Sequence, residues 1–283
     1  MKFTKMHGIG NDYIYVNGFE ENIDNPSEWS IRYSNRHTGI GSDGLVVILP
    51  SAVADFRMRM FNADGSEAQM CGNAVRCIGK YVFDKRLTQK TTLTLETLAG
   101  IRSLTLYLTD DKKTVNNISV DMGEPILESK KIPTTFSENS IINKYVTFSD
   151  KIKYSITCVS MGNPHAVIFT ENISELYLSQ IGEIIENSTQ YFPQRINTEF
   201  VEKINDNRIK MRVWERGSGE TMACGTGASA AVVAAVLNNI CERKTTVELL
   251  GGELSIEWRQ TDNHVYLTGT AETVYEGQTT YNS

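Results

Sequence analysis

The chain has 283 residues, a length typical of about two domains, and its 40% hydrophobic and 22% charged residues are ordinary for a globular protein. Its net charge of −6 argues against binding to nucleic acid or to an anionic membrane, because both partners require a basic surface. No apolar run reaches the roughly 18 residues of a membrane span, and the N-terminus lacks the apolar core of a signal peptide. These features predict a cytoplasmic protein.

The five cysteines and four histidines form no familiar disulfide or metal-binding pattern. An odd, sparse set of cysteines in a long acidic chain is not a disulfide framework, and no Cys-x-x-Cys pair is present. The histidines are scattered and include no His-x-x-x-His. We therefore expect no metal site.

In chain order, a helix is predicted first over residues 73–85, where apolar residues recur at positions 74, 75, 78, 81 and 82. Residues 91–106 alternate apolar and polar side chains around Gly100, which predicts a β-hairpin. The polar segment 128–140 leads into a second half. There the small apolar residues 228–237 predict a helix that is buried on every side, residues 245–258 predict a second hairpin, and 270–280 a last strand.

The two halves repeat one another at a constant offset of 153 residues. Residues 57–73 align without a gap with 210–226, and Cys71-Gly corresponds to Cys224-Gly. Both segments contain Met-Arg, an aromatic residue, a Gly/Ser turn and a glutamate four positions before the cysteine. We expect these glutamates, Glu67 and Glu220, to be loop or capping residues. Upstream, Met6-His-Gly-Ile-Gly-Asn11 is echoed by Met161-Gly-Asn163.

The repeat predicts an α/β (α+β) fold of two pseudo-symmetric domains. Each domain is expected to be a mostly antiparallel sheet wrapped around a central helix. The first domain would comprise residues 1–121, and the second residues 122–269. The final segment, 270–283, is expected to return to the first domain.

Each cysteine is expected at the N-terminus of its central helix. Unpaired N–H groups and partial positive charge at such an end bind anions and lower the pKa of a nearby thiol. Two thiols facing one cleft could form a redox disulfide, supply one Cys–His nucleophile, or exchange protons with opposite faces of a carbon acid. We favour the third chemistry, because it alone requires two equivalent acid–base groups and so explains the duplication. Backbone amides at Gly72, Asn73, Gly225 and Thr226 could then hold the charge that develops on an amino-acid carboxylate.

Three motifs resemble those of the diaminopimelate epimerase family. They are Asn62-Ala-Asp-Gly-Ser-Glu-Ala with Met-Cys71-Gly-Asn-Ala-Val-Arg-Cys77, Met-Gly-Asn163-Pro-His165, and Trp-Glu215-Arg216-Gly-Ser-Gly-Glu-Thr-Met-Ala-Cys224-Gly-Thr-Gly. The resemblance runs from Met6 to the region of Tyr275. It implies an isomerase that interconverts L,L- and meso-diaminopimelate, the precursor of lysine and of peptidoglycan in bacteria, without pyridoxal phosphate, metal or other cofactor. It also implies two similar domains with a cleft between them.

The resemblance assigns roles residue by residue. Cys71 and Cys224 match the catalytic pair, His165 and Glu215 match positions that tune the thiols, and Tyr275 matches a position of dimer contact, so a homodimer is expected. A guanidinium suits the distant carboxylate of the substrate, and amides can both donate and accept hydrogen bonds. The matching substrate-binding positions are Asn11, Asn62, Gly72, Asn73, Asn163, Asn197, Glu215, Arg216, Gly225 and Thr226.

One position departs from the family pattern. Many members carry glutamine after Gly-x-Asp, whereas Gly44 follows Gly41-Ser-Asp here. One substrate contact is therefore missing or supplied by water, and Gly44 is excluded from the site. The other cysteines, Cys77, Cys158 and Cys241, are interpreted as packing residues, and His7 and His37 as structural histidines.

Two alternatives remain open at this point. One is another two-cysteine racemase, acting on proline or histidine. The polar residues Asn62, Asn163, Asn197 and Arg216 favour a substrate with a second zwitterionic end, which proline lacks. The other is a redox-sensing small-molecule binding protein in which Cys71 and Cys224 form a disulfide.

Overall fold

The computed structural model describes residues 1–280 and resolves the chain into two compact units. The first unit comprises Met1–Asp121 together with the C-terminal segment that starts at Thr268, and the second comprises Met122–Leu267. The return to the first unit therefore lies two residues before the expected position 270. Residues 281–283, which we assigned to the first domain, lie outside the described part of the chain.

The first unit contains ten strands and helices from the N-terminal part of the chain and one strand from its C-terminal part. They are β1 (Lys2–Gly8), β2 (Asn11–Asn17), α1 (Pro26–Ser34), β3 (Gly44–Leu49), β4 (Phe56–Asn62), β5 (Glu67–Ala68), α2 (Gly72–Asp84), β6 (Thr92–Thr97), β7 (Gly100–Leu108), β8 (Val115–Asp121) and β18 (Glu272–Gln278).

The second unit begins with the short 3₁₀ helix Ser129–Lys131 and has a second one at Ile173–Glu175. Strand β17 (Val265–Gly269) carries the chain back to the first unit. The other elements are β9 (Lys144–Thr147), β10 (Lys153–Ser160), β11 (Pro164–Phe169), α3 (Leu178–Glu186), β12 (Asn197–Asn205), β13 (Arg208–Glu215), β14 (Gly219–Glu220), α4 (Gly225–Leu237), β15 (Lys244–Leu249) and β16 (Gly252–Trp258). Both hairpins expected from the sequence are present, as β6–β7 and β15–β16.

Strand pairing follows the same scheme in the two units, which confirms the predicted α/β class with mostly antiparallel sheets. The first unit pairs its strands in the order β18-β1-β2-β3-β4-β6-β7-β8, and only β2–β3 and β4–β6 are parallel. The second has the order β9-β10-β11-β12-β13-β15-β16, and only β11–β12 and β13–β15 are parallel. The parallel pairs fall at corresponding places, so each unit is one copy of the repeated element.

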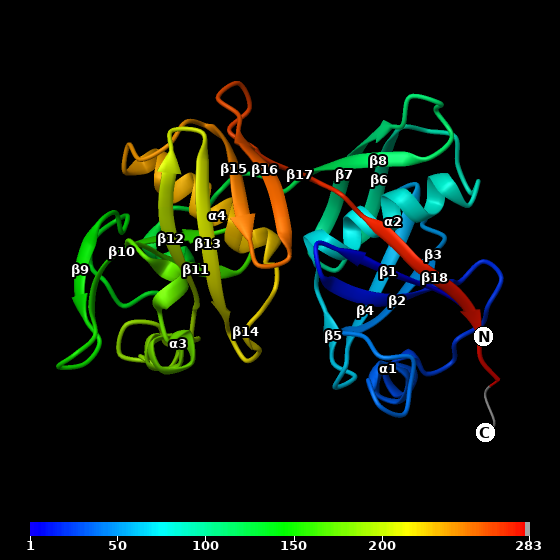
Figure 1. The fold of residues 1–283 in the computed structure, drawn as a ribbon, viewed down its shortest axis with the longest axis horizontal. Helices are drawn as coiled ribbons and strands as arrows, with labels where there is room; N and C mark the ends of the chain where they lie inside the picture. Colours follow the sequence, from blue (N-terminus) through cyan, green and yellow to red (C-terminus); the bar gives the residue numbers. More distant parts are fainter. Residues whose placement is uncertain (281–283) are drawn as a thin grey trace. The chain divides into compact units, whose positions relative to one another are not determined.

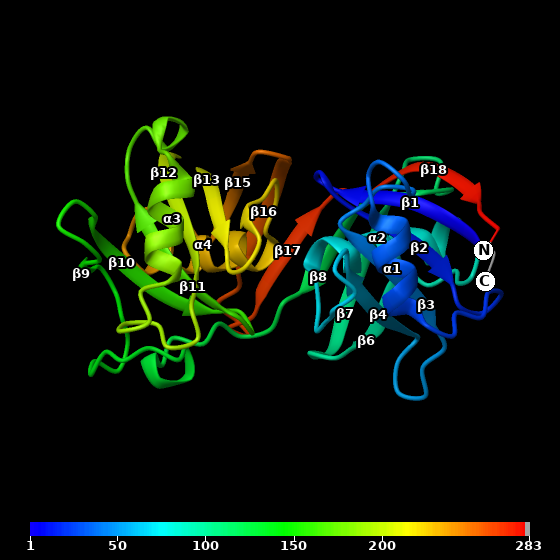
Figure 2. The ribbon, with the colours of Figure 1, turned by 90° about the horizontal axis from the view of Figure 1, so that it is seen from below.

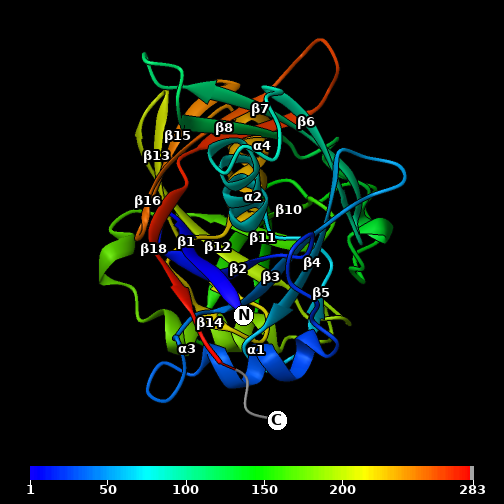
Figure 3. The same ribbon diagram turned by 90° about the vertical axis from the view of Figure 1, so that its right-hand side faces the viewer.

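Each sheet curves around one central helix, α2 in the first unit and α4 in the second (Figures 1 and 2). Both helices have 13 residues, and both ends of α4 lie 153 residues after those of α2. Residues 227–235 of α4 are all buried, as its uniformly apolar sequence predicts. Figure 3 shows α2 end-on among the strands of the first unit, with α1 on the outside against β3 and β4. None of the described helices has the length and apolarity needed to cross a membrane.

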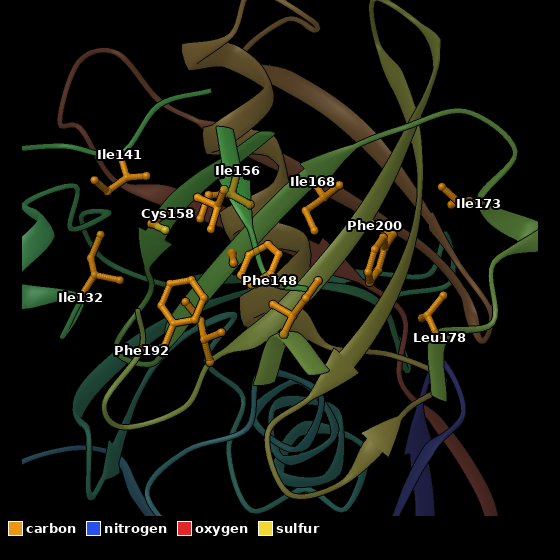
Figure 4. Packing of buried hydrophobic residues seen from close by; sticks show 14 residues of the cluster. Ile132, Ile141, Phe148, Ile156, Cys158, Ile168, Ile173, Leu178, Phe192 and Phe200 are labelled. Carbon is orange, nitrogen blue, oxygen red and sulfur yellow. The ribbon is translucent and has the colours of Figure 1, made fainter. Parts of the chain in front are cut away.

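Strands β10, β11 and β12 are buried on both faces. Their central side chains must therefore be apolar or, if polar, must have hydrogen-bond partners. One face packs on α4. The other face carries Ile156, Ile168 and Phe200 into an apolar cluster with α3 and the preceding loops (Figure 4). Polar side chains on the α4 face of these strands are therefore fixed between two packed layers.

From the sequence we expected the two glutamates of the repeat to be loop or capping residues, and this expectation is wrong. Glu67 and Glu220 lie in the short strands β5 and β14 and each accepts two hydrogen bonds from an arginine on the preceding strand. The distances are 2.7 and 3.0 Å from Arg59 and also from Arg212. These bidentate pairs fix the turns that lead to the two cysteines, which explains why the Met-Arg and Glu positions repeat together.

The two arginine–glutamate pairs should differ in strength. The Arg212 side chain is 13% exposed against 35% for Arg59, and Arg212 also donates to the carbonyls of Ile173 and Leu176. Double-mutant cycles to alanine, read by urea unfolding, should give a coupling of about 1–2 kcal/mol for Arg212–Glu220 and below about 1 kcal/mol for Arg59–Glu67. High salt should weaken the second coupling more. Equal couplings, or the reverse order, would show that burial does not set their strength.

Candidate active site

Cys71 occupies the N-cap of α2, as predicted. Its half-buried thiol donates a hydrogen bond to the Asn11 side-chain oxygen at 3.4 Å, and the Asn73 amide donates to the same oxygen at 3.2 Å. The Asn11 amide nitrogen donates in turn to Asp43 Oδ2 at 2.7 Å. Because Asp43 binds the nitrogen end of this amide, the oxygen end of Asn11 is held toward Cys71.

Asp43 belongs to a network of charged side chains that also contains Asp12, Arg36 and Lys5. Arg36 donates to Asp43 and to Asp12, and Lys5 pairs with Asp12 and donates to the Gly41 carbonyl. Burial works against the Asp12 carboxylate, but hydrogen bonds and charge from Arg36 and Lys5 outweigh it and lower its pKa. Sequence analysis missed this network, since its members are spread over residues 5–43 and no spacing rule connects them.

Arg76 is fully buried within α2 and has no carboxylate partner among the described residues. Its guanidinium donates to the carbonyls of Thr270 and Gly72 and to the Asn73 side chain. Burial lowers the pKa of Arg76, while the nearby sulfurs of Cys77 and Cys71 oppose that shift. Arg76 lies in the motif Cys71-Gly-Asn-Ala-Val-Arg. A charged residue in a helix that is otherwise predicted to be buried was the sequence feature that could have identified it.

Asn62 and Gly44 face each other as register partners in β4 and β3. The Asn62 amide donates to Ser66 Oγ at 3.0 Å. A side-chain carbon at position 44 would collide with the Phe61 carbonyl oxygen and press on Tyr13. The close approach of these two strands therefore requires glycine at this position, so the departure from the family pattern has a structural cause.

Cys224 occupies the N-cap of α4 and is 5% exposed. Its sulfur accepts the backbone N–H of Gly227 at 3.3 Å and lies 3.5 Å from the hydroxyl of Thr226. Gly225 and Thr226 form the first turn of the helix, as Gly72 and Asn73 do in α2. Both cysteines thus have the predicted position at a helix N-terminus.

The expectation of a lowered pKa is wrong for Cys224. Burial raises the pKa of this thiol well above its usual value, and the carboxyl groups of Glu215 and Glu199 raise it further. Hydrogen bonds with the Thr226 hydroxyl and the Gly227 amide act in the opposite direction without prevailing. Burial also raises the pKa of Glu215, whose carboxyl accepts a short hydrogen bond from Thr221.

Asn163, His165 and Thr226 form a connected set in the second unit. Asn163 donates to Thr226 Oγ1 at 3.2 Å, and its carbonyl oxygen lies 3.0 Å from His165 Nε2. The other ring nitrogen of His165 lies 2.7 Å from Glu199, a residue that sequence analysis did not select. A glutamate directly before the apolar pair Phe200-Val201 was its only sequence signal.

Asn197 and Arg216 lie together at the ends of β12 and β13. The Asn197 side chain accepts the backbone N–H of Arg216 at 2.8 Å, and the Arg216 guanidinium donates to the Gln194 carbonyl. Tyr275 lies on β18, 42% exposed, against Phe3. The packing roles expected for Cys77 and Cys158 hold, since both are fully buried, whereas Cys241 is only half-buried. No cluster of three or more potential metal ligands occurs among residues 1–280.

The chain matches the sequence model of diaminopimelate epimerase over residues 3–128 and 157–274. It is 56% identical over 278 residues to a diaminopimelate epimerase of Methanococcus maripaludis (98% of this chain, 99% of the relative). It is 57% identical over 282 residues to one of Acetivibrio thermocellus (100% and 99%). These relatives match nearly their full length.

Solved structures share the fold at low sequence identity. A probable proline racemase from Agrobacterium radiobacter K84 matches with a TM-score of 0.71 at 13% identity, covering 99% of this chain and 93% of that one. A phenazine biosynthesis protein of the PhzF family from Bacillus anthracis matches with a TM-score of 0.68 at 17% identity, covering 99% of both chains. The full-length sequence matches decide the family: the chain belongs to the diaminopimelate epimerase family and is an isomerase.

Proposed function

We propose that the protein interconverts L,L- and meso-diaminopimelate by two-base proton transfer, with Cys71 and Cys224 as the acid–base pair. The observation that carries this proposal is the duplication: each unit places one cysteine at the N-cap of its central helix. A one-base or nucleophilic mechanism needs only one of them. The proposal requires the two sulfurs to lie on opposite sides of one substrate α-carbon.

The reaction balances with these two groups alone. A thiolate removes the α-proton, the electron pair of the broken C–H bond delocalises toward the carboxylate, and the opposite thiol delivers a proton to the other face. The α-carbon is inverted, and thiol and thiolate have exchanged. Backbone amides at Gly72, Asn73, Gly225 and Thr226 stabilise the carboxylate charge, because a helix N-terminus presents N–H groups and partial positive charge.

The surroundings of the sulfurs favour one starting arrangement. The buried Arg76 guanidinium, one helical turn after Cys71 and without a carboxylate partner in the described chain, favours negative charge on that sulfur. Glu215 and Glu199 disfavour negative charge on Cys224. Cys224 is therefore held as the thiol in the free protein, and the two cysteines titrate as a pair.

The distal end of the substrate is bound by the remaining positions that match the family, which are Asn11, Asn62, Asn163, Asn197, Glu215 and Arg216. Arg216 uses one guanidinium nitrogen on the Gln194 carbonyl, which leaves other donors of its planar fork for a carboxylate. His165 and Glu215 tune the thiols. The exposed Tyr275 and Val274 on β18 support a homodimer contact. We also propose a cytoplasmic enzyme that uses no cofactor.

Substitution of either cysteine should abolish epimerisation. In reducing buffer, Cys71→Ser and Cys224→Ser should each lower kcat with L,L-diaminopimelate by at least about 10²–10⁴-fold, because each removes one proton-transfer group. Cys241→Ser, a matched change at a half-buried thiol outside the site, should retain wild-type turnover.

Specificity separates the proposal from its alternatives. Equal turnover of L-proline or L-histidine would favour a different racemase, and a redox sensor would turn over no amino acid. Near-normal turnover by either single cysteine variant would overturn the two-base mechanism.

The protonation state of Cys224 can be tested by alkylation. Since its pKa is raised above the ordinary value of 9.0, the rate of Cys224 modification by iodoacetamide should still be rising at that pH. Glu215→Gln removes a negative charge and should move the rise to lower pH. Peptide mass spectrometry distinguishes this site from Cys71. A plateau reached below about pH 8 would contradict the assignment of Cys224 as the resting thiol.

A further inference from the structure

A buried glutamate–histidine pair lies beneath the N-terminus of α4. Glu199 of β12 and His165 of β11 are both completely buried, with Glu199 Oε1 2.7 Å from His165 Nδ1. Glu199 Oε2 has no hydrogen-bond partner in the described chain. Burying a carboxyl with one unsatisfied oxygen costs free energy, so packing alone gives no reason for a glutamate here. Val46, the residue at the same offset in the first unit, is apolar.

The position of the pair connects it to Cys224. A side-chain carbon at Gly227 would come within 2.7 Å of Glu199 Oε1 and 3.2 Å of the Cys224 sulfur. Only the glycine of the first helical turn separates the carboxyl group from the thiol. Two other ionisable groups face the Glu199 carboxyl group and the Cys224 thiol, namely Glu215 from β13 and Cys158 from β10. Burial raises the pKa of the Cys158 thiol.

The hydrogen bonds from this pair have a defined direction. The Asn163 side-chain oxygen can only accept, so His165 Nε2 must carry a hydrogen. The Asn163 amide nitrogen then donates to Thr226 Oγ1. Because that hydroxyl oxygen already accepts, its own hydrogen is free to point at the Cys224 sulfur, 3.5 Å away. The sulfur thereby receives two donors, the Thr226 hydroxyl and the Gly227 amide.

We propose that Glu199 is a positioning residue that, through His165, Asn163 and Thr226, directs a hydrogen-bond donor at the Cys224 sulfur. Its Oε1 hydrogen-bonds His165 Nδ1, and this contact holds the ring with Nε2–H toward Asn163. The donor stabilises the thiolate that forms when Cys224 gives up its proton during turnover. This effect rests on the proposed function, whereas the direction of the bonds does not.

The test combines ring NMR with kinetics on the full-length protein. ¹⁵N-labelled wild type, Glu199→Gln and Glu199→Leu are compared, and the His165 signals are identified by their loss in His165→Gln. Glu202→Gln is the matched control, since Glu202 lies on the same strand but its carboxyl accepts the Ile173 amide instead. Exchange of the α-proton of L,L-diaminopimelate in D₂O is measured for each variant.

We expect His165 Nε2 to be protonated in wild type and in Glu199→Gln, because a glutamine side chain keeps a hydrogen bond to Nδ1. Exchange by Glu202→Gln should stay within about threefold of wild type, less than the effect of one lost hydrogen bond. Glu199→Gln, which keeps a hydrogen bond to His165, should exchange faster than Glu199→Leu. Glu199→Leu should lose the fixed tautomer and about tenfold in exchange rate, the factor one such bond gives.

A wild-type ring protonated only on Nδ1 would overturn the inference, and this result does not depend on how any variant folds. A folded Glu199→Leu with wild-type exchange would overturn it as well. Absence of exchange in the wild type would instead reject the proposed function, while the tautomer would still decide the direction of the bonds.

Discussion

The N-terminus of a buried helix must find partners for amides that the helix itself leaves unpaired, and the rest of this structure depends on how that constraint is met. In both units a cysteine is the N-cap, and its sulfur is hydrogen-bonded, by Asn11 of β2 in the first unit and by Thr226 and Gly227 of α4 itself in the second. The arginine–glutamate pairs of β4–β5 and β13–β14 fix the turns that deliver each cysteine to its helix. The backbone geometry is thus duplicated at the two helix N-termini, where a cysteine thiol and the carboxylate of the proposed substrate would lie together.

The side chains behind the two sulfurs are not duplicated. The first unit contributes a buried arginine and an asparagine held by Asp43, whereas the second contributes the buried carboxyl groups of Glu199 and Glu215. Opposite charge beside the two equivalent thiols separates the acid and base roles of chemically identical groups. Symmetry of the backbone and asymmetry of charge are therefore both needed for the proposed exchange of one proton between two thiols.

Much of the fold follows from the sequence because its signals are local. The helix stripe at 73–85, the apolar run at 228–237 and both hairpins depend on short-range periodicity, and the constant offset identifies the repeat. The polar network was less predictable. Asp43, Arg76 and Glu199 act through contacts with residues distant in sequence or inside a packed layer. The raised pKa of Cys224 results from total burial and neighbouring carboxyl groups, and a helix-terminus argument contains neither.

The central claim is that two different groups handle the proton on opposite faces of the α-carbon. The most direct measurement is the early distribution of deuterium when L,L-diaminopimelate reacts in D₂O. With two bases, the proton delivered comes from a solvent-equilibrated thiol, so deuterium should appear in the meso product while recovered substrate stays unlabelled. Deuterium entering substrate and product equally from the first turnovers would show that a single group serves both faces and would contradict the account.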